Sequence, residues 1–148
     1  MMIGVSGAGK SSCVESIVDG DIILSTDRWL EEYAKLNDLT YNEAFQMKYK
    51  ESEMALRQDL AFAIRHGQNI IWDQTNLTKK TRKRKLAMIP KEYRKVAILI
   101  NTPPEIIHES NNSGRGLPNH VINDMIMRLE PPTEDEGFSK IVVIERVK

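Results

Sequence analysis

The chain has 148 residues, of which 41% are hydrophobic and 28% are charged. This length suits one ordinary globular domain, and this composition allows a buried core, so disordered and fibrous proteins are excluded. Lysine and arginine together number 21, as do aspartate and glutamate, which excludes a strongly basic protein that coats nucleic acid. The charges are nevertheless segregated: residues 1–78 carry 7 basic and 12 acidic residues, whereas residues 79–148 carry 14 and 9.

The single cysteine, Cys13, excludes an intrachain disulfide and a zinc site built on several cysteines. No hydrophobic run approaches the roughly 18–20 residues that a membrane span needs, and residues 1–3 lead into a glycine rather than into a signal sequence. We therefore expect a protein that is cytoplasmic or otherwise intracellular, with no membrane partner.

Short apolar runs alternate along the chain with longer helix-like stretches, which is typical of parallel strands joined by crossover helices. In chain order, the predicted elements are a strand at 1–3, a helix at 10–18, a strand at 22–25, helices at 28–36 and 41–66, a strand at 69–72, a helix at 79–89, a strand at 96–100, helices at 104–111 and 119–129, and a strand at 141–144. The helix at 41–66 has the clearest ends, since Thr40 and Glu43 match a capping box and Gly67 follows the last turn. Residues 1–148 are predicted to form a single α/β domain.

The most specific motif lies between the first strand and the first helix. Residues 4–11 read Gly-Val-Ser-Gly-Ala-Gly-Lys-Ser and match the P-loop pattern, in which backbone N–H groups and a helix N-terminus bind phosphate. We expect Lys10 to bridge the β- and γ-phosphates of ATP and Ser11 to bind Mg²⁺. The predicted nucleotide-binding residues of this motif are Gly4, Ser6, Gly7, Ala8, Gly9, Lys10, Ser11 and Ser12. The alternative is a glycine-rich turn that binds no ligand.

Two aspartates come just after predicted strands: Asp27 follows residues 22–25, and Asp73 follows residues 69–72. The carboxyl ends of parallel strands form the usual ligand-binding edge of an open α/β sheet. Asp73 is therefore the first candidate to hold Mg²⁺ or its water shell, and Asp27 is a candidate catalytic carboxylate. The alternative for each aspartate is a helix N-cap.

Residues 110–118 form a polar, glycine-containing loop between two predicted helices, with Arg115 at its centre. Phosphoryl transfer needs positive charge around the moving group and benefits from exclusion of water. The segment is therefore predicted to be a lid that brings Arg115 to the donor phosphates. The alternative is an arginine that only contacts solvent.

Several separated stretches resemble the P-loop polynucleotide kinases, namely the phage 5′-hydroxyl polynucleotide kinase and the kinase domain of the animal kinase-phosphatase. The matching stretches are residues 4–11, Asp27, Asp73-Gln74-Thr75-Asn76, residues 112–116, Glu130-Pro131-Pro132-Thr133 and Glu136-Gly137-Phe138. The resemblance implies a kinase fold with a central five-stranded parallel sheet and a helical lid. It also implies a nucleic-acid repair enzyme that uses ATP and Mg²⁺ to phosphorylate the 5′-hydroxyl end of DNA or RNA.

Residue by residue, the resemblance makes Asp27 the general base that takes the proton of the 5′-hydroxyl. Lys10 and Ser11 match the phosphate and metal ligands, and Arg115 matches the lid arginine that contacts the donor phosphates. Asp73 matches the acid on the third strand of the family.

The substrate side of the resemblance is less complete. Thr26 and Leu30 stand where members of the family have arginines, so Arg28 is the replacement candidate for contact with the acceptor phosphate. Trp29, beside it, is a candidate for stacking on a base, with a place in the core as the alternative. Asn76 either orients Asp73 or touches substrate.

The segment Lys79-Lys80-Thr81-Arg82-Lys83-Arg84-Lys85 places six cations in seven residues. Like charges this close repel one another, and a polyanion would relieve the repulsion through phosphate contacts. The segment therefore favours binding of the acceptor nucleic acid, with Lys79, Lys80 and Arg82 as candidate substrate contacts; the alternative is a solvated helix face. Two other functions stay open: a P-loop kinase for a nucleoside, nucleotide or small hydroxyl metabolite, and a module that binds ATP without chemistry.

Overall fold

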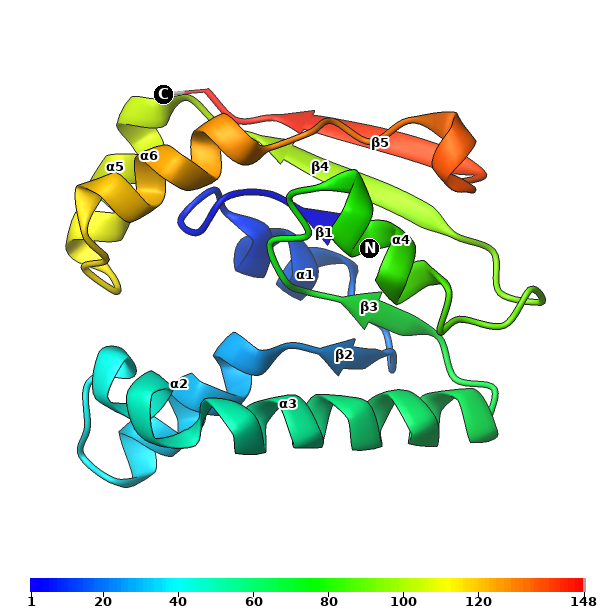
Figure 1. Ribbon diagram of the computed structural model, residues 1–148, viewed down its shortest axis with the longest axis horizontal. Coiled ribbons are helices and arrows are strands. Elements are labelled where there is room, and N and C mark those ends of the chain that lie inside the picture. Colours follow the sequence, from blue (N-terminus) through cyan, green and yellow to red (C-terminus); the bar gives the residue numbers. More distant parts are fainter. Residues whose placement is uncertain (148) are drawn as a thin grey trace. The chain divides into compact units, whose positions relative to one another are not determined.

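The computed structural model describes residues 1–147, in which strands and helices alternate as predicted (Figure 1). The strands are β1 (Met2–Ile3), β2 (Ile22–Leu24), β3 (Ile70–Trp72), β4 (Val96–Asn101) and β5 (Lys140–Glu145). The helices are α1 (Lys10–Ile17), α2 (Thr26–Leu36), α3 (Tyr41–Arg65), α4 (Lys79–Leu86), α5 (Pro104–Ser113) and α6 (Asn119–Arg128), and a 3₁₀ helix, η1, covers Glu134–Glu136. Every predicted strand and helix is confirmed, with ends shifted by at most three residues, whereas η1 was not predicted.

All strand pairs are parallel, but the strands of residues 1–147 form two sheets. One sheet has the order β1-β4-β5, and the other consists of β2 and β3. The α/β fold class is confirmed, and the single five-stranded sheet implied by the family resemblance is wrong. The first three strands are short, with two residues in β1 and three each in β2 and β3, so they offer few backbone groups for a continuous ladder.

The chain divides into two compact units. Unit 1 comprises Met1–Ile17 and Thr75–Lys148, and unit 2 comprises Val18–Gln74. Unit 1 holds the three-stranded sheet with α1, α4, α5 and α6, whereas unit 2 holds the two-stranded sheet with α2 and α3. The single domain expected over residues 1–148 stays a prediction.

The core of unit 1 anchors the P-loop motif. One buried cluster joins β1 and β4 to the segment before β5, and a second joins the P-loop to α5 and α6. Their buried members are Ile3, Ala97, Leu99 and Phe138 in the first cluster and Val5, Leu77, Ile107 and Ile122 in the second. Because Val5 belongs to the motif itself, its burial fixes the start of the loop to the helices on either side of residues 114–118.

Unit 2 is built on the packing of α2 against α3, around the buried residues Leu30, Ala34 and Ala44. Helix α3 begins with the predicted capping box: the Thr40 hydroxyl accepts from the Glu43 N–H, and the Glu43 carboxylate accepts from the Thr40 N–H. It is not one straight helix, since the backbone of Lys48 leaves helical geometry at φ −131° and ψ 16°. The first two turns of α3 are thus set off from the rest by a kink.

Candidate functional site

The P-loop of unit 1 links β1 to α1 and has the backbone that its glycines predict. Gly7 and Gly9 have φ angles of +87° and +107°, which L side chains rarely adopt. The Ala8 N–H donates to the Val5 carbonyl at 3.0 Å and closes a turn inside the loop. The buried Lys10 ammonium donates to the carbonyl oxygens of Gly4 and Val5, both at 2.9 Å, so it lies over the start of its own loop.

These features fit a bound triphosphate. The Lys10 ammonium contacts neutral carbonyls, and phosphate oxygens are stronger partners because they are charged. Ser11 and Ser12 are exposed in the first turn of α1, where the positive end of the helix favours an anion. Within residues 1–147 no three His, Cys, Asp or Glu side chains form a metal-holding group. The exposed Ser11 hydroxyl, at the start of α1, is an oxygen ligand of the kind that Mg²⁺ takes beside substrate phosphates.

Two arginines from distant parts of the sequence lie against the P-loop within unit 1. Arg115 Nη1 donates to Ser6 Oγ at 3.3 Å, and Arg146 Nη1 donates to the Ala8 carbonyl at 3.1 Å. A Cβ atom added to Gly9 would stand 2.7 Å from Arg146 Nη1, so the guanidinium covers that glycine. The P-loop thus carries cations from the α5–α6 connection and from the end of β5 as well as Lys10.

A buried asparagine, Asn111, holds the segment that carries Arg115 by hydrogen bonds to its backbone. Asn111, at 3% exposure, accepts from the Leu117 N–H at 2.9 Å and donates to the Leu117 carbonyl at 2.7 Å. The Gly116 N–H also donates to the Asn111 carbonyl at 2.8 Å. The proximity of Arg115 to the motif agrees with the predicted lid arginine, although closure of a lid stays a prediction.

Sequence reasoning missed Arg146. The signal was available, because Arg146 directly follows the carboxyl end of β5 and the same rule had selected Asp27 and Asp73 at the ends of other strands. The pairing of β4 with β5 extends to the Arg146 N–H, which donates to the Asn101 carbonyl at 2.9 Å. This bond fixes the backbone from which the side chain reaches the P-loop.

The two aspartates of unit 2 are not helix N-caps. The cap of α2 is Ser25, whose hydroxyl accepts from the Arg28 N–H at 3.2 Å, and the cap of α4 is Thr78. Asp27 lies one residue inside α2, so the alternative that the sequence left open for both aspartates is excluded.

Each aspartate has a side-chain partner within unit 2. The Tyr41 hydroxyl donates to Asp27 Oδ1 at 2.5 Å. Asp73 is buried at 5% exposure, and its Oδ2 lies 3.4 Å from Arg28 Nε. Arg28, which was predicted to contact an acceptor phosphate, is therefore already paired with Asp73.

Two further predictions concern Trp29 as a stacking residue and the pair Ser11 and Asp73 as metal ligands. The Trp29 ring stacks on Tyr33, with centroids 5.7 Å apart and planes 3° apart, so one of its faces is already occupied in unit 2. The predicted metal pair, Ser11 and Asp73, divides between unit 1 and unit 2, and its joint role stays a prediction.

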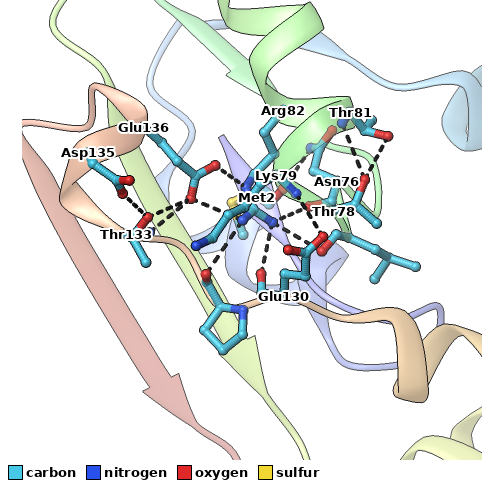
Figure 2. A network of polar contacts seen from close by, with 12 residues as sticks. Met2, Asn76, Thr78, Lys79, Thr81, Arg82, Glu130, Thr133, Asp135 and Glu136 are labelled. Atoms are coloured by element: carbon cyan, nitrogen blue, oxygen red, sulfur yellow. Dashed lines mark hydrogen bonds and ion pairs between the residues drawn. The ribbon is translucent and has the colours of Figure 1, made fainter.

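Asn76 and Arg82, both predicted to contact substrate, are buried in unit 1 (Figure 2). Asn76 has φ +47°, donates to the Met2 carbonyl at 2.7 Å and accepts from Lys85 Nζ at 2.5 Å. Arg82 has no exposed surface and binds both Glu136 carboxylate oxygens, at 2.8 and 3.0 Å. The structure therefore corrects both predictions, because these side chains are directed into the unit.

The remaining donors of Arg82 are also used. Its Nη1 donates to the carbonyl oxygens of Asn76, Leu77 and Glu130 at 2.9–3.1 Å. The Thr133 N–H donates to the same Glu136 carboxylate at 2.8 Å. Burial raises the pKa of Glu136, but the bonds from Arg82 and Thr133, with the charges of Arg82 and Lys79, outweigh it and hold the pKa below its ordinary value of 4.5.

The outward face of α4 keeps four exposed cations: Lys79, Lys80, Lys83 and Arg84. Successive helix residues are about 100° apart, so positions i, i+1, i+4 and i+5 share one side while Arg82 points away from it. Acidic groups lie close to one end of this face, since the Lys79 N–H donates to Glu130 Oε1 at 3.3 Å. We call Lys79, Lys80, Lys83 and Arg84 the cationic face.

A comparison with known families covers most of the chain. A family model described as an AAA domain matches residues 1–132. The matched range includes the P-loop, Arg115 and both aspartates, and the family is one of P-loop NTPases with kinase-like members. The match supports an NTPase or phosphotransferase activity, for which such domains generally use a nucleoside triphosphate with Mg²⁺. No helix within residues 1–147 combines the length and hydropathy that a membrane crossing requires.

Proposed function

The chain belongs to the AAA domain family of P-loop NTPases, and from this premise we propose that it is an ATP-dependent polynucleotide kinase. The reaction moves the γ-phosphoryl group of ATP to the 5′-hydroxyl end of DNA or RNA. The observation that carries the choice of acceptor is the cationic face of α4, which keeps four exposed cations in unit 1, the unit that also holds the P-loop.

On the donor side, the P-loop backbone and Lys10 bind the β- and γ-phosphates. Arg115, already against Ser6, and Arg146, already against Ala8, are close enough to the loop to add positive charge there. Ser11 would hold Mg²⁺, which neutralises phosphate charge when it is bound. Preorganised cations of this kind stabilise the charge of the transferred phosphoryl group.

On the acceptor side, Asp27 acts as the general base. Its carboxylate takes the proton of the 5′-hydroxyl, and the hydroxyl oxygen forms a bond to the γ-phosphorus. The bond from that phosphorus to the β–γ bridging oxygen breaks, and its electron pair leaves with ADP. Asp73, in its ion pair with Arg28, is the second acid and takes the metal-associated role.

The cationic face binds the backbone of the acceptor without reading its sequence. Each lysine or arginine that contacts a phosphate releases counterions, so the affinity for an oligonucleotide falls as salt rises. A nucleoside or another small acceptor has no phosphate backbone to use these contacts. A contribution of the cationic face to acceptor binding therefore distinguishes a polynucleotide kinase from a kinase of small metabolites.

The test of the chemistry compares wild type with Asp27→Asn, using labelled ATP, Mg²⁺ and a 5′-hydroxyl oligonucleotide. We expect transfer of label to the 5′ end and a loss of about 10²–10⁴-fold in kcat for the variant, the range that general base catalysis contributes. Asp59→Asn, an exposed aspartate on α3, is the matched control and should keep the wild-type rate. Equal rates for the two variants would reject Asp27 as the base.

The test of the acceptor removes three charges in each of two places. Lys80→Ala/Lys83→Ala/Arg84→Ala should raise the KM for an oligonucleotide about 10-fold or more at low salt and reduce the salt dependence of KM. The control, Lys50→Ala/Arg57→Ala/Arg65→Ala, removes three exposed cations from α3 and should change KM much less. Phosphorylation of a nucleoside with the same efficiency as an oligonucleotide would instead indicate a small-molecule kinase.

A further inference from the structure

Tyr41 and Asp27 meet at the start of two different helices of unit 2. Tyr41 is the first residue of α3, and Asp27 is the second residue of α2. The Tyr41 hydroxyl donates to Asp27 Oδ1 at 2.5 Å, a short contact for a phenol and a carboxylate. Nothing in the P-loop motif or the strand ends requires this partner, since Tyr41 lies 14 residues beyond the aspartate.

The position of the Tyr41 hydroxyl is set by the cap and the packing of its own helix. Tyr41 follows the N-cap Thr40, whose reciprocal bonds with Glu43 fix the first turn of α3. The Tyr41 ring packs against the buried cluster of α2 and α3, and it contacts Phe45 with ring centroids 6.2 Å apart. The kink at Lys48 separates this turn from the longer part of α3. A hydroxyl held in this way can fix a flexible carboxylate.

We infer that Tyr41 is a positioning residue that holds the Asp27 carboxylate in the orientation needed to accept the proton of the acceptor hydroxyl. The inference rests on the proposed role of Asp27. A carboxylate is planar, so a hydrogen bond at Oδ1 fixes the orientation of both of its oxygens. Fixing a general base matters because misplacement by about 1 Å can lower a rate about 10²-fold.

The contrast with Asp73 supports this assignment. Asp73 faces the guanidinium of Arg28, with its Oδ2 atom 3.4 Å from Arg28 Nε. Tyr41 is a neutral donor, so it orients Asp27 without adding a positive charge. The two acids of unit 2 thus have different partners, a neutral phenol for Asp27 and a guanidinium for Asp73.

The experiment compares Tyr41→Phe with Tyr49→Phe in the full chain. Tyr49 is a matched control, because it lies on the same helix and its hydroxyl also donates to a carboxylate, that of Glu53 at 3.0 Å. Single-turnover rates are measured with two acceptors, a 5′-hydroxyl oligonucleotide and water, and they are expressed per ATP-binding site by titration with ATP. This normalisation separates a slower reaction from partial unfolding.

For Tyr41→Phe we expect a loss of about 10-fold in the transfer rate, with the KM for ATP unchanged within about twofold, whereas Tyr49→Phe keeps both values. In an Asp27→Asn background the Tyr41 substitution should have no further effect, since residues that act together are not additive. An equal loss in both backgrounds, or equal rates for the two Tyr→Phe variants, would overturn the inference. If wild type hydrolyses ATP but leaves the oligonucleotide unchanged, the proposed function fails, and the hydrolysis rates still decide the role of Tyr41.

Discussion

Arg146 and Arg82 belong to the same unit, but Arg146 is exposed whereas Arg82 is buried. Arg146 is exposed and makes one hydrogen bond to the P-loop, to the Ala8 carbonyl at 3.1 Å. Arg82 has no exposed surface and binds Glu136 through two nitrogens while also donating to several carbonyl oxygens (Figure 2). A guanidinium whose donors are all satisfied inside the protein stabilises the fold, whereas one that donates to a neutral carbonyl of a phosphate loop can exchange that partner for an anion. The following predictions test this difference.

The largest expected effect is on stability, from Arg82→Ala. Removing one partner of a buried ion pair leaves the carboxylate of Glu136 uncompensated and typically costs about 3–5 kcal/mol. Arg84→Ala is the matched control, because Arg84 lies on the exposed face of the same helix and should change the unfolding free energy by less than about 0.5 kcal/mol. Urea denaturation measures both values, and similar losses for the two variants would contradict the contrast between buried and exposed cations.

Lys10→Met should produce the largest loss of activity on the P-loop side. The variant keeps the apolar stem but removes the charge that binds phosphate, so we expect a loss of about 10²–10³-fold in the rate of ATP turnover. The measurement is a single-turnover assay with labelled ATP. Lys95→Met provides a control, since Lys95 also donates to backbone carbonyls of unit 1 but does so far from the motif in sequence. A nearly normal rate for Lys10→Met would remove the lysine from phosphate binding.

Glu136→Gln tests the buried network through pH. Glu136 has a lowered pKa, so its ionised form contributes stability that is fully present above its ordinary value of 4.5 and is lost as the pH falls through the lowered folded value. At pH 7 the free energy of unfolding of the variant should be about 2 kcal/mol lower than that of wild type, since the substitution replaces a charged hydrogen-bond acceptor by a neutral one.

Below pH 4.5 the difference between wild type and Glu136→Gln should shrink as the carboxylate becomes protonated. Denaturant titrations at pH 7, 5 and 3.5 measure this trend. Glu134→Gln, an exposed residue of the same 3₁₀ helix, should change the free energy little at every pH. A difference that stays constant into acid would show that the Glu136 charge is not what stabilises the network.

The smallest expected effect comes from Arg146→Ala. Loss of this cation should lower kcat/KM for ATP about 10-fold, equivalent to about 1.4 kcal/mol, and should leave the unfolding free energy nearly unchanged. Arg128→Ala is the control, because Arg128 is exposed and pairs only with Asp124 on its own helix among the ion pairs observed in residues 1–147. Steady-state kinetics with varied ATP measures the effect, and identical kinetics for the two variants would show that Arg146 does not act on the bound nucleotide.

Local features were predictable where neighbouring residues alone decide the conformation. The glycines of the P-loop permit the positive φ angles observed at Gly7 and Gly9, and the Thr40–Glu43 capping box starts α3 at the expected residue. Packing of α2 on α3 was needed to find the Tyr41 partner of Asp27, since no spacing rule links residues 14 positions apart on two helices. The division of the strands into two sheets was likewise not predictable, because strand pairing joins segments that are distant in sequence.

The sequence by itself determined the order of strands and helices, the P-loop and its nucleotide chemistry, because these depend on short motifs whose backbone needs are met locally. Only the tertiary structure decided which basic residues are buried in ion pairs and which are exposed to solvent. Arg82 and Arg84 look equivalent in a run of six cations, yet two residues of helix turn Arg82 toward Glu136 and leave Arg84 exposed. Tertiary structure also carried Arg115 and Arg146 to the P-loop, because a long side chain acts where the fold brings its backbone, and that place is set by packing between distant segments.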